Sequence, residues 1–163
     1  MITYSSLHSF TIVPLTFNNP SNQFRVMEEL FGVEEGERVY STNVECYDVK
    51  VLYKLKLGEE NIIPSVVKYL NNLYKLKEYN RLIVEYNIEK GKTIIVLGEG
   101  EKLLLANSYN TVDFGSAIYY ILEVLRENQI NPHQTLVNLY AAPTIDELNL
   151  IERYLKGVKV CAL

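Results

Sequence analysis

The chain of 163 residues contains no tryptophan and only two cysteines, and it has no apolar run of the roughly 20 residues that a membrane-spanning helix needs. Its first ten residues lack the basic segment and long apolar segment of a secretory signal peptide. Cys46 and Cys161 lie far apart, without the density of a secreted disulfide scaffold. We therefore expect a cytoplasmic protein with two reduced core thiols and no membrane association.

Concentrated positive charge is also missing. The net charge is −4, and lysines such as Lys50, Lys54 and Lys56 are scattered rather than clustered. Because the sequence-independent part of nucleic-acid binding depends on a basic patch, we expect no nucleic-acid partner. His8 and His133 have neither an i+4 histidine nor a nearby cysteine, so no metal site is predicted.

Nucleotide and nucleophile motifs are equally sparse. The sequence Gly98-Glu99-Gly100 lacks the third glycine and the following helix of a dinucleotide fingerprint, so it predicts a hairpin turn and no cofactor. No nucleophile elbow is present. The chain is nevertheless 48% hydrophobic and contains 13 tyrosines. Tyrosine suits a sheet surface or a partner-binding face because its ring can be buried while its hydroxyl stays in contact with water.

The clearest element is a helix at residues 112–128. Asn110 is a candidate N-cap, and Asp113 would place an acid in the first turn, near the exposed amides of the helix N-terminus. Apolar residues then recur at helical spacing and predict one buried stripe: Phe114, Ile118, Ile121, Leu122 and Leu125.

Strand patterns surround this helix. Residues 82–86, 93–97 and 102–108 precede it, and residues 135–140 follow it. A second helix begins with the capping box of Thr144 and Glu147, buries Leu155 and ends at Gly157, and residues 158–163 form a last strand. The order βββαβαβ predicts an α/β fold with a mixed five-stranded sheet in which strand 82–86 lies between 93–97 and 135–140, as in the ribonuclease H-like fold and in each half of actin-like ATPases.

The first half is simpler. We expect a strand at 8–15, a helix that ends at Gly32, strands at 38–44 and 46–55, and a helix at 61–75 with Pro64 in its first turn. A polar stretch at 75–80 predicts two lobes, a truncated N-terminal actin-like lobe at 1–77 and a ribonuclease H-like C-terminal lobe at 78–163.

Two segments carry a resemblance to a known family. They are TIVPLTF at 11–17, with Val13-Pro14 and Phe17, and NSYNTVDFGSAIYYILEVL at 107–125. Together they resemble an uncharacterised bacterial family of unknown function with an actin-like ATPase fold, and the resemblance covers nearly the whole chain. Family members carry a further N-terminal hairpin that residues 1–10 cannot form, so this chain looks like a shortened member. The resemblance implies the fold but no activity.

The chain has few of the residues that a catalytic site in either of these folds needs. An actin-like ATPase needs glycine and aspartate at its phosphate hairpins, whereas the turn at 86–91 has one glycine and no aspartate, and Ala141-Ala142-Pro143 replaces a glycine-rich adenosine loop. Two-metal nuclease chemistry needs converging carboxylates. The available residues are Glu85, which we expect to face solvent, Asp113, Glu123, and Asn138 in place of an acid.

We therefore predict a degenerate, non-catalytic protein without cofactors that binds another protein or itself. An unprotected sheet edge in the first lobe favours a homodimer. The alternative is a nucleotide-binding ATPase or phosphotransferase with a non-standard site. Adjacent helical residues point about 100° apart, so we expect either Tyr119 or Tyr120 to pack on the sheet. The candidate cleft or partner-binding residues are Tyr86, Asn87, Asn107, Tyr109, Asp113, Tyr119 and Tyr120.

Overall fold

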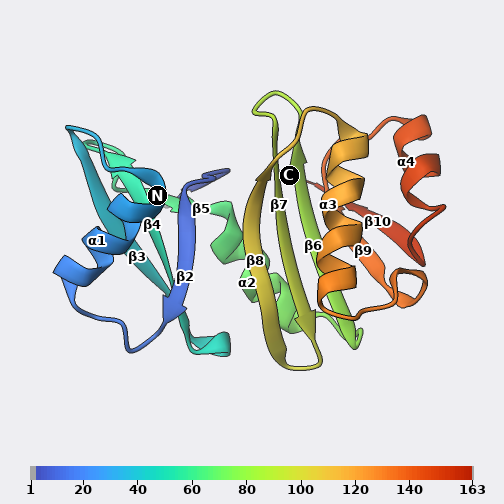
Figure 1. Cartoon of the computed structure of the whole chain (residues 1–163), viewed down its shortest axis with the longest axis horizontal. Helices are drawn as coiled ribbons and strands as arrows, with labels where there is room; N and C mark the ends of the chain where they lie inside the picture. Colours follow the sequence, from blue (N-terminus) through green and yellow to red (C-terminus); the bar gives the residue numbers. More distant parts are fainter. Residues whose placement is uncertain (1–2, 163) are drawn as a thin grey trace. The chain divides into compact units, whose positions relative to one another are not determined.

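The structure is a computed structural model and describes residues 3–162. The chain divides into two compact units, the first ending at Tyr74 and the second beginning at Lys75. The sequence predicts this division between residues 77 and 78. Figure 1 shows the first unit in blue to green and the second in green to red.

The second unit is built on a mixed five-stranded sheet in the order β10-β9-β6-β7-β8. The antiparallel strands β6 (Asn80–Asn87), β7 (Lys92–Glu99) and β8 (Lys102–Asn110) form two consecutive hairpins. Strand β9 (Leu136–Tyr140) runs parallel to β6, and β10 (Gly157–Cys161) runs parallel to β9. Leu82 pairs with Leu97 on one side and Val137 on the other, which confirms the predicted central strand.

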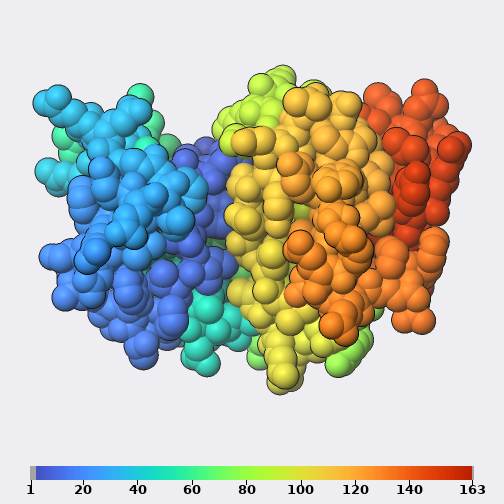
Figure 2. All heavy atoms as spheres, in the orientation of Figure 1, coloured from blue at the N-terminus to red at the C-terminus, as the bar shows by residue number. Residues whose placement is uncertain are grey.

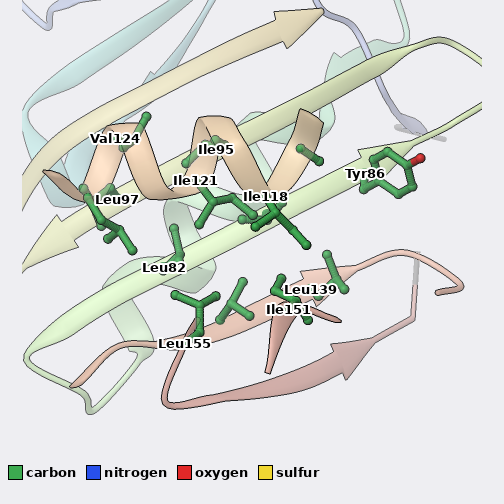
Figure 3. Packing of buried hydrophobic residues seen from close by; sticks show 14 of the residues in the cluster. Leu82, Tyr86, Ile95, Leu97, Ile118, Ile121, Val124, Leu139, Ile151 and Leu155 are labelled. Carbon is green, nitrogen blue, oxygen red and sulfur yellow. The ribbon is translucent and has the colours of Figure 1, made fainter. Parts of the chain in front are cut away.

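The core of this unit lies between the sheet and helix α3 (Phe114–Glu127). Alternate residues of β6, Leu82, Val84 and Tyr86, face this helix because side chains alternate across a strand. Figure 3 shows Ile118, Ile121 and Val124 of α3 over Leu82, Ile95 and Leu97 of the sheet, with Leu139, Ile151 and Leu155 completing the cluster.

Two helix boundaries differ from the prediction. Asn110 is the last residue of β8, where it lies opposite Lys92, so Asp113 rather than Asn110 caps α3. Helix α4 (Ile145–Ile151) ends before Leu155, which is buried but lies outside the helix. The N–H of Lys156 donates to the carbonyls of Pro132 and Thr135. These bonds direct the chain into β10, and Gly157 is therefore the first residue of that strand rather than a helix stop.

The first unit contains a three-stranded antiparallel sheet in the order β2-β4-β3, formed by β2 (Phe10–Pro14), β3 (Glu37–Val44) and β4 (Val49–Lys56). Helix α1 (Pro20–Phe31) ends as predicted at Gly32, which has a φ of 65°. This sheet contains none of the parallel crossover pairs of the second unit.

Three further expectations need correction. A 3₁₀ turn at Glu45–Tyr47 separates β3 from β4, so the fourth strand begins at Val49. Pro64 lies in β5 (Ile62–Pro64), which pairs in parallel with β1 (Thr3–Ser5), and helix α2 (Ser65–Lys75) starts after it. The free cysteines Cys46 and Cys161 are only half-buried and do not belong to the core.

Among residues 3–162, no helix combines the length and apolar character that crossing a membrane would require.

Replacing Leu82 by alanine tests the position of the core. Leu82 is fully buried between the sheet and α3, so we expect the substitution to lower the free energy of unfolding by about 2–5 kcal/mol. Urea denaturation followed by circular dichroism measures this change. The matched control Leu57→Ala, at a position that is 57% exposed, should leave the unfolding midpoint almost unchanged.

Candidate functional site

A pocket of about 410 Å³ lies at the carboxyl ends of β6 and β9 in the second unit. Tyr86 and Asn87 end β6, and Ile88 and Glu89 belong to the hairpin that follows it. The other wall comes from the segment between β9 and α4, with Ala142, Thr144 and Glu147. Open α/β sheets bind ligands at this end of their parallel strands, and we therefore take this pocket as the candidate site.

The hairpin wall of the pocket is fixed by local hydrogen bonds. The Asn87 side-chain oxygen accepts from the Lys90 N–H at 3.0 Å, and the Gly91 N–H donates to the Ile88 carbonyl at 3.1 Å. Gly91 has a φ of 58°, a left-handed conformation that favours glycine. The single glycine of this turn is therefore used to close the hairpin.

Tyr86 is the buried polar residue of the pocket. Its ring packs edge-on against Phe114, the first residue of α3, with ring centroids 5.1 Å apart. The residue is 8% exposed, and its hydroxyl has no hydrogen-bond partner among residues 3–162. Burial, and then the nearby carboxylates of Glu147 and Asp113, raise the pKa of the Tyr86 phenol. The hydroxyl therefore keeps its proton at neutral pH.

The opposite wall is fixed by the predicted capping box of α4. The Thr144 hydroxyl accepts from the Glu147 N–H at 3.2 Å, and the Thr144 N–H donates to Oε2 of Glu147 at 2.8 Å. These bonds hold one carboxylate at the pocket, and Glu89 adds a second from the hairpin. No lysine or arginine is among the lining residues, so the charged side chains of the pocket are both acidic.

Asp113 plays a capping role at α3. Its carboxylate accepts from the backbone N–H of Ser116 at 2.7 Å and from the Ser116 hydroxyl at 2.9 Å. These bonds stabilise the ionised form and lower the pKa of Asp113. Of the predicted candidate residues, Tyr86 and Asn87 line the pocket, and Asp113 contributes to the electrostatic field at Tyr86.

The remaining candidates gather elsewhere, where β8 meets α3. Tyr109 stacks on Tyr120 with centroids 4.7 Å apart, and Tyr119 meets Tyr120 edge-on at 5.4 Å. Burial raises the pKa of Tyr109, although a hydrogen bond with the Asn107 side chain partly opposes the shift. Tyr120 is therefore the tyrosine that packs on the sheet, as expected for one of the pair, whereas Tyr119 is 59% exposed.

An apolar groove of about 250 Å³ lies between α3 and the segment containing α4, and the sequence prediction did not include it as a site. It is lined by Gly115, Ile118, Tyr119, Leu122, Leu150 and Tyr154. The spacing of the four α3 residues is i, i+3, i+4 and i+7, which is typical of a helix contact face. Figure 2 shows α3 in gold to orange and α4 in red-orange on the same visible face.

Glu85 does not face solvent as predicted. It is 2% exposed because β6 is a central strand, and every residue of that strand from Leu82 to Tyr86 is buried. On the neighbouring strand β9, Asn138 is 5% exposed and its side-chain amide donates to the Leu82 carbonyl at 3.2 Å. Within residues 3–162, no three His, Cys, Asp or Glu side chains are grouped so that they could hold a metal ion.

These features define an α/β protein with the fold of actin-like ATPases. The chain is similar to a crystal structure from Bacteroides thetaiotaomicron, described as a protein with actin-like ATPase fold and unknown function. The TM-score is 0.80 at 17% identity, and the match covers 97% of this chain and 66% of that chain. The protein belongs to the family described as "Protein of unknown function (DUF3822)", whose model matches residues 2–158. No curated protein matches the chain.

Replacing Tyr86 by phenylalanine tests the unpaired hydroxyl. Because the variant removes a buried polar group without a partner, we expect the free energy of unfolding to rise by about 1 kcal/mol in urea denaturation. The raised pKa of Tyr86 also predicts that native stability falls as the pH rises above the ordinary value of 10.0, since the unfolded chain loses the proton first. Tyr86→Phe should reduce that alkaline loss.

Tyr79→Phe is the matched control, because Tyr79 is 69% exposed. A Tyr86→Phe protein that is clearly less stable than the wild type would contradict the view that its hydroxyl is unpaired.

Proposed function

We propose that this protein is non-catalytic and acts through protein contacts, and that the groove between α3 and α4 binds a second copy of the chain. The observation that carries the proposal is the exposed apolar surface of that groove, in which Tyr119 is 59% and Tyr154 42% exposed. Tyrosine is enriched at protein interfaces because its large ring can be buried while its hydroxyl keeps a polar contact.

The outer face of α3 suits contact with another helix. Gly115, Tyr119 and Leu122 follow one another at i, i+4 and i+7 on the groove side of the helix. Gly115 has no side chain, so a second backbone can approach closely at that point, while Tyr119 and Leu122 offer apolar surface. This arrangement favours a helical occupant over an extended one.

Charge complementarity favours a second copy of α3 in the antiparallel direction. Arg126 follows Tyr119 by seven residues, so it lies on the same face. Its side chain is 73% exposed and forms an ion pair with Glu123 of its own helix, a pairing that is weak at an exposed position. An antiparallel pair that places Tyr119 opposite the partner's Leu122 also places Gly115 opposite the partner's Arg126. The guanidinium would then lie beside Asp113 at the start of the helix. Opposite charges would therefore meet at both ends of a two-fold contact.

The residues of the β6–β9 pocket support the non-catalytic part of the proposal. Transferring a phosphoryl group requires cations or several N–H donors around the phosphates. The pocket instead presents the carboxylates of Glu89 and Glu147. Like charges in a partly enclosed site repel, so a triphosphate would bind there at a cost.

The rival function is nucleotide binding, and the position of the pocket at the ends of β6 and β9 favours it. A thermal unfolding assay with MgATP and MgGTP distinguishes the two functions. A bound nucleotide at about 100 times its dissociation constant would stabilise the protein by roughly 2.7 kcal/mol. We expect no stabilisation by either nucleotide at millimolar concentration, and a clear rise in the melting temperature would support the rival function.

Sedimentation velocity across micromolar concentrations tests self-association. We expect the wild type to pass from monomer to dimer, and Tyr119→Ala to weaken the dimer about tenfold, because it removes an aromatic anchor near the centre of the contact. Arg126→Glu should weaken it further at low salt. Tyr4→Ala is the matched control, since Tyr4 is 50% exposed and lies in β1. A wild-type protein that stays monomeric throughout would overturn the self-association proposal.

A further inference from the structure

We propose that the pocket at the ends of β6 and β9 binds an aliphatic amine, whose ammonium group lies between the carboxylates of Glu89 and Glu147 and within hydrogen-bond reach of the Tyr86 hydroxyl. This inference is independent of self-association, because the groove lined by Tyr119 and Leu122 shares no residue with the pocket.

The first observation is the set of unused acceptors. Oε2 of Glu147 accepts from the Thr144 N–H, while its Oε1 receives no hydrogen bond from residues 3–162. Glu89 makes no hydrogen bond or ion pair with any residue in that range, and no cation lines the pocket. An ammonium group has three N–H donors and no acceptor, so it matches a site rich in carboxylate oxygens.

The second and independent observation is the Tyr86 hydroxyl. The side chain is more than nine-tenths buried, and its hydroxyl has no partner in the described part of the chain. The edge-on contact with Phe114 fixes the ring, and Figure 3 shows it at the end of β6, apart from the other labelled core side chains. A hydroxyl left unpaired in this position destabilises the free protein, and a ligand N–H that donates to it removes that cost.

The shape of the pocket favours an alkyl amine over a metal ion or a phosphate. Ile88 and Ala142 give it apolar walls that suit a methylene chain, and its volume of about 410 Å³ can hold a small organic molecule. A divalent metal ion needs about six oxygen ligands, more than two carboxylates and a phenol provide. A phosphate would meet two like charges. A short aliphatic amine satisfies all three groups at once.

The test is isothermal titration of the full chain with putrescine and with spermidine. We expect saturable binding of at least one amine, with no comparable heat from MgCl₂ or from NaCl at the same ionic strength. Glu89→Gln and Glu147→Gln should each weaken binding about tenfold, because each removes one charge-assisted partner. Glutamine can replace glutamate in a capping box, so Glu147→Gln keeps the start of α4 intact.

Tyr86→Phe separates a ligand contact from a structural role. We expect it to weaken amine binding about fivefold while the free protein melts at the same or a higher temperature, because the substitution removes only the unpaired hydroxyl. A purely structural role would instead lower the melting temperature together with the affinity. Glu101→Gln, in the β7–β8 hairpin outside the pocket, is the charge-matched control and should bind like the wild type.

Three results would overturn the inference: no saturable heat with either amine at millimolar concentration, an equal response to MgCl₂, or the same loss of affinity in Glu101→Gln as in Glu89→Gln. Self-association is measured separately, by sedimentation velocity of the wild type and of Tyr119→Ala, a substitution outside the pocket. Failure of amine binding is thus distinguishable from failure of the proposed dimer.

Discussion

The pairing of β6 with two different neighbours is the constraint on which the second unit depends. An antiparallel bond ladder joins it to β7, and a parallel ladder joins it to β9. The parallel pairing requires α3 to cross the sheet between β8 and β9, and that crossing buries Leu82 and Val84 against the helix. It also brings the β6–β7 hairpin and the start of α4 to the same edge, so the pocket follows from the topology.

The chemistry at this edge differs from what an actin-like ATPase needs. Two elements of the fold border the pocket: the tight hairpin after β6 and the start of α4 after β9. Their side chains are glutamates, an asparagine amide that closes its own turn, and a buried phenol. These residues, rather than the fold, are the grounds for the proposed binding of a positively charged ligand, because one fold can carry many different functions.

The two surfaces proposed as functional would bind their ligands through different physical interactions. The groove at α3 and α4 is apolar and exposed, so binding there would gain from removing surface from water. The pocket adds the carboxylates of Glu89 and Glu147 and the Tyr86 side chain to its apolar walls, so binding there would depend on matching charges and hydrogen bonds. Asp113 relates the two sites, because it caps α3 and also adds to the field at Tyr86.

In the second unit, the amino-acid sequence alone determined the local elements and, with the rules of chain crossing, the position of β6 between β7 and β9. The β-rich run of β6, the turn at Gly91 and the capping box of Thr144 and Glu147 are short-range signals that act within a few residues. Tertiary structure decided the rest: the burial of Glu85, the choice of Asp113 over Asn110 as the cap, the unpaired Tyr86 hydroxyl and the groove shared by Leu122 and Leu150. Asp113 caps α3 through a local bond to Ser116, but the pairing of Asn110 with Lys92, like the other features, depends on neighbours that are distant in the sequence, about which residue spacing carries no information.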